Sequence, residues 1–180
     1  ELRGKAPRGV RLFTAGATPA AATIEIVERD LGWELTHVYG LTETTPLIAI
    51  CEPRALHMDL SIEERAKIKA RQGIELISSG ELKVVDENGA EVAKNGETLG
   101  EIAVRGNVVM KGYYNDPVST DAAIRDGWFY TGDAAVVHDD GYLEISPYEI
   151  SHESDGGDSY GGYGITPALS LYRGVVEDGN

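Results

Sequence analysis

One short loop of the sequence gathers side chains that suit a nucleotide. The stretch "YGLTETTP", residues 39–46, follows an apolar run and combines an aromatic ring, a glycine, hydroxyl groups and one carboxylate. The ring of Tyr39 offers a flat face for a base, the hydroxyl of Thr42 suits a phosphate oxygen, and the carboxylate of Glu43 is a hard oxygen ligand for Mg²⁺. Each residue alone is weak evidence, because a tyrosine in this setting is more often a core residue than a stacking platform. Their combination makes the loop a candidate binding site.

A second candidate side chain is Asp133, in the stretch "YTGDAAVVHDDGYLEISPY" of residues 130–148. Two apolar runs around a His-Asp-Asp-Gly turn predict a β-hairpin with Asp133 at its mouth. A carboxylate held there can accept hydrogen bonds from both hydroxyls of a diol. Taken alone, such an aspartate more often stabilises a turn than binds a ligand. The apolar pattern stops after Ile145.

The segment of residues 10–39 predicts the β-α-β unit that would position the first loop. Apolar runs at residues 10–15 and 34–39 predict two strands, and Thr18 as N-cap with Pro19 as the first helical residue predicts a helix between them. A crossover of this length makes the strands parallel, so the loops that follow them emerge at the same edge of the sheet.

Ligands of open α/β sheets bind at this edge. Gly16 and Gly40 follow the two predicted strands, and each would let the backbone approach a ligand closely. Each glycine is equally well explained as a simple turn at a strand end.

A second helix is predicted over residues 61–72, because Ser61 and Glu64 have the spacing of a capping box and Gly73 ends the pattern. The charged residues of this helix are expected to form a solvated face: Glu63, Glu64, Arg65, Lys67, Lys69 and Arg71.

The apolar period changes to two from residue 80, which predicts a small antiparallel β subdomain over residues 80–145. Residues 108–114 are predicted to be one of its strands. Residues 146–180 are rich in glycine and acidic residues without a clear period, as in a disordered tail.

The composition excludes several classes of protein. The chain has 180 residues, is 42% hydrophobic and carries a formal net charge of −14. This charge disfavours nucleic acids and anionic membranes as partners, and no apolar run has the roughly 18 residues of a membrane span. The single Cys51 cannot form an internal disulfide and has no basic neighbours that would make it a catalytic thiol, so an intracellular, cytoplasmic protein is expected.

Four segments together resemble the motifs of adenylate-forming enzymes, the superfamily of acyl-CoA synthetases, luciferases and peptide-synthetase adenylation domains. They are, in order, "GATP" at residues 16–19, "YGLTETTP" at residues 39–46, "GEIAVRGNVVMKGYYNDP" at residues 100–117 and "GWFYTGDAAVVHDDGYLEI" at residues 127–145. Within the superfamily the sequence is most similar to fatty-acyl-CoA synthetases of bacteria and related plant enzymes. The family reaction joins a carboxylate to AMP with release of pyrophosphate, then transfers the acyl group to the thiol of coenzyme A.

This resemblance implies a role for each candidate residue. Gly16 and Ala17 would line the adenine and acyl pocket, and Tyr39, followed by Gly40, would stack on adenine. Asp133 would accept hydrogen bonds from the ribose hydroxyls.

The same resemblance implies two catalytic residues, Thr42 as a phosphate contact and Glu43 as the ligand of Mg²⁺. The cofactors and substrates it implies are ATP or AMP, Mg²⁺, coenzyme A and a small carboxylic acid, most simply a fatty acid.

The cations that the chemistry needs are not found in the sequence. The family's phosphate-binding loop ends near a lysine, whereas its nearest imitation, "ISSGE" at residues 77–81, has none and is predicted to be a turn. The family's adenylation lysine would fall beyond Asn180. Without either cation, developing phosphate charge has little to stabilise it. We therefore expect the isolated segment to be inactive.

The family pattern also changes in the last segment. Counting forward from Ile145 puts Pro147 and Tyr148 where an Asp-Arg pair is expected and Ile150 at the hinge lysine. Neither Pro147 nor Tyr148 can replace a guanidinium group. Three alternative explanations of the missing Asp-Arg pair and hinge lysine are open: divergence, a frameshift in the gene, or an engineered or misassigned end.

The sequence therefore predicts an α/β protein plus a small antiparallel β subdomain, a fragment of the large domain of an adenylate-forming enzyme. Residues 1–79 would be the C-terminal part of an α/β nucleotide- and acyl-binding subdomain, residues 80–145 the β subdomain, and residues 146–180 a degenerate hinge and the start of a C-terminal domain. A ligase for aryl or amino acids and a non-catalytic adenine-nucleotide-binding module are the alternatives. Open sheet edges would favour self-association.

Overall fold

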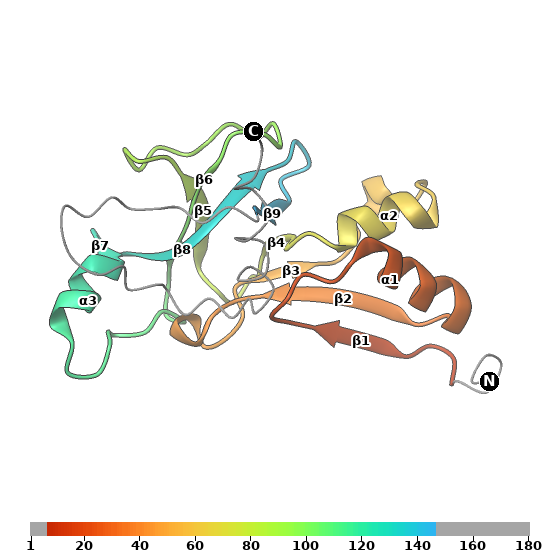
Figure 1. Ribbon diagram of the computed structural model, residues 1–180, viewed down its shortest axis with the longest axis horizontal. Coiled ribbons are helices and arrows are strands. Elements are labelled where there is room, and N and C mark those ends of the chain that lie inside the picture. Colours follow the sequence, from red (N-terminus) through yellow and green to blue (C-terminus); the bar gives the residue numbers. More distant parts are fainter. Residues whose placement is uncertain (1–6, 147–180) are drawn as a thin grey trace, which may run out of the picture.

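The computed structural model describes residues 7–146, which form two β-sheets joined side by side (Figure 1). The first sheet contains, in spatial order, β1 (Arg11–Thr14), β2 (Glu34–Tyr39), β3 (Ala49–Cys51) and β4 (Ile74–Glu75). Strands β1 and β2 are parallel, which confirms the predicted β-α-β unit, and β3 and β4 continue the sheet in antiparallel pairing. The sequence did not predict β3 and β4, because strands of 3 and 2 residues are too short to show a period.

The second sheet is antiparallel, as the sequence predicted. It contains, in spatial order, β5 (Glu81–Val85), β6 (Gly100–Arg105), β8 (Trp128–Val137) and β7 (Ile124–Arg125), with β9 (Leu143–Ile145) also paired to β8. The predicted hairpin is formed by β8 and β9, where Ala135 lies opposite Ile145 and Val137 opposite Leu143.

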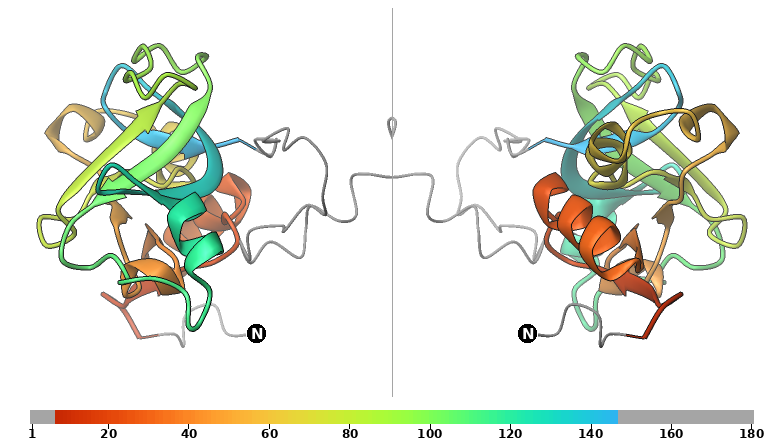
Figure 2. Two further views of the ribbon diagram at one scale, coloured as in Figure 1. Left: turned by 90° about the vertical axis from the view of Figure 1, so that its left-hand side faces the viewer. Right: turned by 90° about the vertical axis from the view of Figure 1, so that its right-hand side faces the viewer.

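Helices cover one face of the first sheet and one end of the second. They are α1 (Ala21–Ile26) with its π-helical continuation η1 (Val27–Leu31), the short 3-10 helices η2 (Thr42–Thr44) and η3 (Ala55–His57), α2 (Ile62–Lys69) and α3 (Pro117–Ala123). End-on views show α3 at one end of the molecule and α1 at the other (Figure 2). Gly32 ends η1 with a φ of 66°, as predicted, and Ser61 and Glu64 form the predicted capping box of α2.

The predicted start of the first helix is wrong. Ala20, not Thr18, is the N-cap, and Ala20 has extended backbone with φ −65° and ψ 133°. The hydroxyl of Thr18 instead accepts a hydrogen bond from Nε2 of Gln72 at 3.0 Å. The hydroxyl that would otherwise cap the helix is therefore bonded to Gln72, a residue from a distant segment.

The predicted strand at residues 108–114 is also wrong, because the segment follows a path of turns. Its backbone groups bond to the loop after β2: the Thr45 hydroxyl donates to the Val108 carbonyl at 2.9 Å, and the Met110 amide donates to the Glu43 carbonyl at 2.7 Å. These bonds replace a strand ladder and hold the segment against the candidate loop.

Lys69 contradicts the predicted solvated face of α2. Its side chain is 4% exposed and forms an ion pair with Glu28 of η1. Helix α2 packs against α1, and Lys69 reaches Glu28 in the continuation of α1, so its charge is buried and paired. Lys67 on the same helix is exposed and pairs with Glu63 at 2.7 Å. The helix also ends at Lys69 rather than at the predicted Gln72, and Gly73 pairs with Leu143 in the sheet region.

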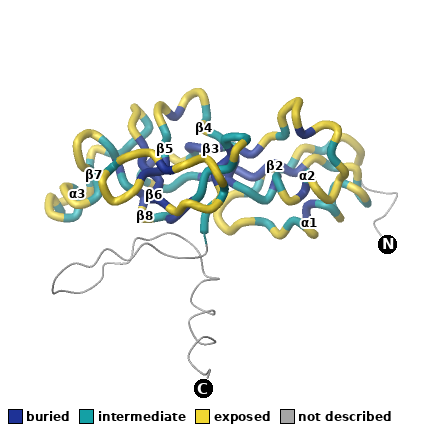
Figure 3. The backbone as a smooth tube through the Cα atoms, turned by 90° about the horizontal axis from the view of Figure 1, so that it is seen from above, coloured by how far each residue is buried: buried dark blue, intermediate teal, exposed yellow. Residues whose placement is uncertain are grey.

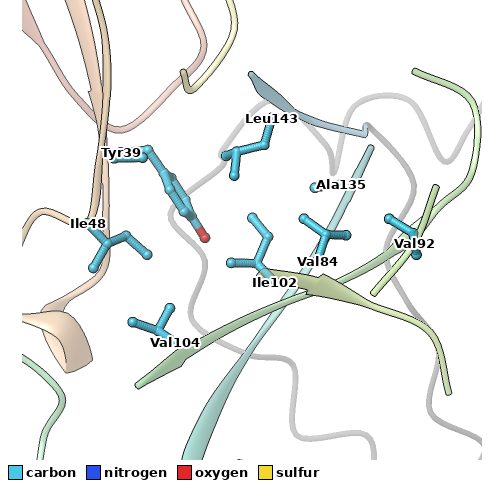
Figure 4. Close-up of a cluster of buried hydrophobic side chains, with 9 residues drawn as sticks. Tyr39, Ile48, Val84, Val92, Ile102, Val104, Ala135 and Leu143 are labelled. Carbon is cyan, nitrogen blue, oxygen red and sulfur yellow. The ribbon is translucent and has the colours of Figure 1, made fainter. Parts of the chain in front are cut away.

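The two sheets share one hydrophobic core. Buried positions concentrate where the sheets meet (Figure 3). The cluster contains Tyr39, Ile48 and Ala49 from the first sheet and its loops, and it contains the following residues of the second half: Val84, Val92, Ile102, Val104, Ala135 and Leu143 (Figure 4). A smaller cluster of Ile24, Leu35 and Ala66 lies between β2 and the helices. Strand β2 therefore connects both clusters.

The predictions made for Pro147, Tyr148 and Ile150 lie outside the described residues. Residue Ser146 closes the described chain, where its amide donates to the Ala134 carbonyl at 2.8 Å. Within residues 7–146, no helix has both the length and the apolar character that crossing a membrane requires.

Candidate nucleotide-binding site

The junction of the two sheets brings Tyr39 and Asp133 together. Tyr39 is the last residue of β2, and Asp133 lies within β8 of the other sheet. The Tyr39 hydroxyl donates to Oδ2 of Asp133 at 2.5 Å. Tyr39 is only 8% exposed and belongs to the shared core cluster (Figure 4). The predicted stacking of its ring on a base stays a prediction.

Burial governs the ionisation of both groups. Burial raises the pKa of the Tyr39 phenol well above its usual value, and the charge and hydrogen bond of Asp133 raise it further, so Tyr39 remains a hydrogen-bond donor. Burial also raises the pKa of Asp133, the hydrogen bond from Tyr39 lowers it, and the charge of Glu101 raises it. Asp133 is thus a half-buried carboxylate, and a hydrogen bond from the Tyr39 phenol stabilises its charged form.

The loop after β2 is shaped by one buried hydroxyl. The Leu41 amide donates to Oγ1 of Thr44 at 2.9 Å, and this hydroxyl donates back to the Leu41 carbonyl at 3.0 Å. Thr44 is fully buried, whereas Thr42 is exposed and Glu43 is half-buried. The loop therefore uses Thr44 for its own structure and presents the two predicted catalytic residues near its surface.

Gly40 is required by the path of this loop. A Cβ atom at Gly40 would lie 1.9 Å from the Pro46 carbonyl oxygen and 2.7 Å from the Cα of Leu47. No side chain can replace the glycine without moving the loop that carries Thr42 and Glu43. Its predicted close approach to a ligand stays a prediction.

Glu43 has a neighbour that the sequence did not identify. The Tyr113 hydroxyl donates to Oε1 of Glu43 at 3.2 Å, and the other carboxylate oxygen takes no part in this hydrogen bond. Tyr113 comes from the segment that was predicted to be a strand, and its only signal in the sequence was its place in the third motif. Within residues 7–146, no group of three His, Cys, Asp or Glu side chains could hold a metal. A Mg²⁺ ion at Glu43 would therefore rely on phosphate oxygens, which is how Mg²⁺ is commonly held beside nucleotides.

Gly16 and Ala17 follow β1 and are exposed. Because β1 and β2 are parallel, they lie at the strand ends on the same edge of the sheet as the Tyr39 loop. Gly16 has a φ of +86°, a conformation that favours glycine. Among the described contacts, no hydrogen bond joins Gly16 or Ala17 to the other candidates, and their pocket role stays a prediction.

The expectation that Cys51 has no basic neighbours is wrong, because the charges of Arg71 and Lys69 act on its thiol and lower its pKa. Burial has the larger effect and opposes a role as a catalytic thiol. Cys51 is fully buried and its thiol donates to the Ile68 carbonyl at 3.1 Å. Burial raises the pKa of this thiol to about 12, so it is not a thiolate near neutral pH.

The fold and these residues define part of the large domain of an adenylate-forming enzyme. Residues 2–114 match the model of the family described as AMP-binding enzyme, and the chain belongs to this family. The fold class and the resemblance to adenylate-forming enzymes are thereby confirmed.

Known relatives are acyl-activating enzymes and CoA ligases. The "Probable acyl-activating enzyme 5, peroxisomal" of Arabidopsis thaliana is 48% identical over 139 residues, which cover 77% of this chain and 25% of the relative. The "4-hydroxybutyrate–CoA ligase 2" of Metallosphaera sedula is 50% identical over 136 residues, 76% of this chain and 24% of the relative. The chain thus spans about a quarter of the length of these two relatives.

The fold also matches solved structures. An o-succinylbenzoate coenzyme A synthetase from Bacillus subtilis, solved in complex with AMP, has a TM-score of 0.60 and 27% identity. The match covers 75% of this chain and 25% of that chain.

Proposed function

We propose that the chain provides the adenosine-binding part of an ATP-dependent acyl-CoA synthetase that acts on a fatty acid. The observation that carries the proposal is the meeting of Tyr39 and Asp133, from two different sheets, beside the loop that presents Thr42 and Glu43. A nucleotide needs a base platform, a diol acceptor and phosphate contacts close together, and this junction offers each of these groups.

The roles follow from the chemistry of the side chains. The Asp133 carboxylate accepts hydrogen bonds from the ribose hydroxyls, and Tyr39 presents its ring to adenine next to it. Gly16, Ala17 and Gly40 form the backbone walls of the pocket.

Thr42 and Glu43 act at the phosphates. The Thr42 hydroxyl donates to a phosphate oxygen, and the carboxylate of Glu43, which also accepts a hydrogen bond from Tyr113, would hold Mg²⁺. When bound, Mg²⁺ neutralises charge on the phosphates.

The proposed reaction joins a carboxylate oxygen to the α-phosphorus of ATP and releases pyrophosphate. The coenzyme A thiol then loses its proton and forms a bond to the acyl carbon, while the acyl–phosphate bond breaks and AMP leaves. A fatty acid substrate and a cytoplasmic location are supported by the sequence resemblance. The names of two relatives favour a different substrate and a different location: one is named as a ligase of 4-hydroxybutyrate, and one is named as peroxisomal. A ligase for a short hydroxy or aryl acid is therefore the second candidate, and a non-catalytic nucleotide-binding module is the third.

Calorimetric titration of the chain with AMP and with 2′,3′-dideoxy-AMP tests the proposal. We expect AMP to bind about tenfold more tightly, since the diol adds hydrogen bonds to a carboxylate. In Asp133→Asn this preference should shrink, whereas Asp139→Asn, an exposed carboxylate in the same hairpin, should keep it. Equal affinity of the unsubstituted chain for both nucleotides would show that Asp133 does not bind ribose.

A pyrophosphate assay separates binding from turnover. With ATP, Mg²⁺ and a series of fatty acids, we expect the 180-residue chain to release pyrophosphate only at the background rate, because it lacks the family's two cationic contacts. Release above background would overturn this expectation and would reveal the acid that the chain accepts.

A further inference from the structure

The strand that carries Asp133 contains a bulge next to it. Glu101 of β6 pairs with Ala134 of β8, and Ala103 pairs with Tyr130, so Thr131 to Asp133 lie opposite Ile102 alone. Gly132 within this bulge has a φ of +79°. A bulge interrupts the ladder of backbone hydrogen bonds and re-aims the side chains beside it. The backbone amide of Gly132 therefore needs a partner outside the ladder.

Glu101 supplies that partner. Its Oε1 accepts a hydrogen bond from the Gly132 amide at 3.0 Å, and its Oε2 lies 3.5 Å from Nη2 of Arg125. Arg125 is itself placed by Tyr130, whose ring centre is 3.7 Å from the guanidinium carbon. The Glu101 residue is only 7% exposed, and burying a carboxylate is costly unless it is hydrogen-bonded and paired.

We propose that Glu101 is a positioning residue for nucleotide binding, which holds the bulge of residues 131–133 so that Asp133 faces the ribose, with Arg125 balancing its charge. This inference rests on the proposed role of Asp133. It explains why Glu101 is buried although it lies on the face of β6 opposite the core residues Ile102 and Val104.

The electrostatics of the site connect the two carboxylates. The charged and titratable groups that face Asp133 are Tyr39 from β2 and Glu101 from β6, and the side chain of Thr131 accepts a hydrogen bond from the Asp133 amide at 3.1 Å. Since the Glu101 charge raises the pKa of Asp133, removing this charge must lower it. A residue that served only to fill space would not change the titration of Asp133 in this direction.

Two variants separate the acceptor from the charge. Glu101→Gln keeps an oxygen for the Gly132 amide but removes the charge, and Glu101→Ala removes both. Glu81→Gln is the matched control, because Glu81 lies in the same sheet, is exposed and pairs with Arg105 at 2.7 Å. NMR on the nucleotide-free chain measures the Asp133 carboxyl titration and the hydrogen exchange of the Gly132 amide, and AMP affinity is compared with that of 2′,3′-dideoxy-AMP.

We expect Glu101→Gln to lower the pKa of Asp133 and to leave the Gly132 amide protected. Glu101→Ala should accelerate exchange of that amide about tenfold and reduce the preference for AMP, as expected for the loss of one hydrogen bond. Glu81→Gln should change neither. If Glu101→Ala does not fold, the titration in Glu101→Gln decides.

An unchanged Asp133 titration in Glu101→Gln, or an unchanged AMP preference in a folded Glu101→Ala, would overturn the proposal. If the parent chain itself shows no AMP preference, the role of Asp133 fails and the nucleotide-positioning role of Glu101 fails with it. The exchange of the Gly132 amide would then still show whether Glu101 holds the bulge, so the two failures remain distinguishable.

Discussion

The hydroxyl of Tyr39 and the carboxylate of Asp133 meet at 2.5 Å although 94 positions separate them in the sequence. The bond joins the end of a parallel strand to an antiparallel sheet, and Tyr39 belongs to the core that the two sheets share (Figure 4). The candidate site and the junction of the two sheets are therefore the same structural feature, and changes at either residue should affect both binding and stability.

Tyr39→Phe should destabilise the chain by about 1.5 to 3 kcal/mol at pH 7, the usual contribution of a hydrogen bond to a charged group. It should also raise the pKa of Asp133, because the phenol donor holds that pKa down. Urea unfolding and carboxyl NMR measure the two effects. Tyr130→Phe on β8 is the control, since Tyr130 contacts Arg125 through its ring. Equal unfolding midpoints for the parent and Tyr39→Phe would contradict the prediction.

Asp133→Asn should stabilise the chain at neutral pH while it weakens AMP binding. The folded pKa of Asp133 is raised above its ordinary value of 3.8, so the folded state binds this proton more tightly than the unfolded state. Stability is therefore lost as the pH rises from below 3.8 through the raised folded pKa, and the asparagine variant lacks this loss. Unfolding free energies of both proteins from pH 3 to pH 7 should differ least at the acid end. A difference that does not change with pH would show that Asp133 ionises without cost.

Lys69→Met should cost about 3 to 5 kcal/mol of stability, because it leaves the Glu28 carboxylate without its cation in a mostly buried site. The double variant Glu28→Gln/Lys69→Met should recover much of this loss. Lys67→Met is the matched control on the same helix and should leave the unfolding midpoint unchanged, since Lys67 is exposed. Chemical denaturation of the four proteins measures these effects, and similar losses for the two lysine variants would refute a buried pair.

Gly40→Ala should destabilise the chain by more than about 2 kcal/mol, through the contact of the new Cβ with the Pro46 carbonyl. Gly127→Ala provides a comparison, because a Cβ at Gly127 meets nothing within 4 Å and the φ of +78° is the only obstacle. Its cost should be about 1 to 2 kcal/mol. Thermal and urea unfolding would show whether steric contact exceeds backbone strain, and the reverse order would mean that the loop of residues 40–46 moves easily.

Phe13→Lys should reduce self-association of the chain. Strand β1 lies at an edge of its sheet, and Phe13 in this strand is 61% exposed. A charge on an edge strand opposes pairing with a second chain. Sedimentation velocity at several concentrations measures the change, with Tyr114→Lys as control because Tyr114 is exposed outside the strands. A parent chain that stays monomeric at all concentrations would contradict the prediction, which the sequence made for open sheet edges.

Local patterns in the sequence predicted elements whose signals lie within a few residues. The capping box of Ser61 and Glu64, the stop at Gly32 and the hairpin around Gly141 need only neighbouring residues, and each is present. The parallel pairing of β1 and β2 also followed from local information, because the length of the crossover determines the direction of the second strand.

Three of the wrong predictions share one physical cause, which is a partner from a distant segment. Thr18 bonds to Gln72 instead of capping its helix, residues 108–114 bond to the loop after β2 instead of a strand, and Lys69 is buried against Glu28. Propensity describes what a segment does among its neighbours and cannot include such partners.

By itself the sequence determined the alternation of strands and helices, the residue types of the candidate site and their order in a family of known chemistry, because these depend on periodicity and on motifs. Only the tertiary structure decided that Tyr39 bonds to Asp133, that Tyr113 reaches Glu43 and that Glu101 holds the Gly132 amide. Each of these contacts joins residues that are 31 or more positions apart. They form because folding brings distant segments side by side, and a polar group that loses contact with water there must find a partner wherever the chain places one.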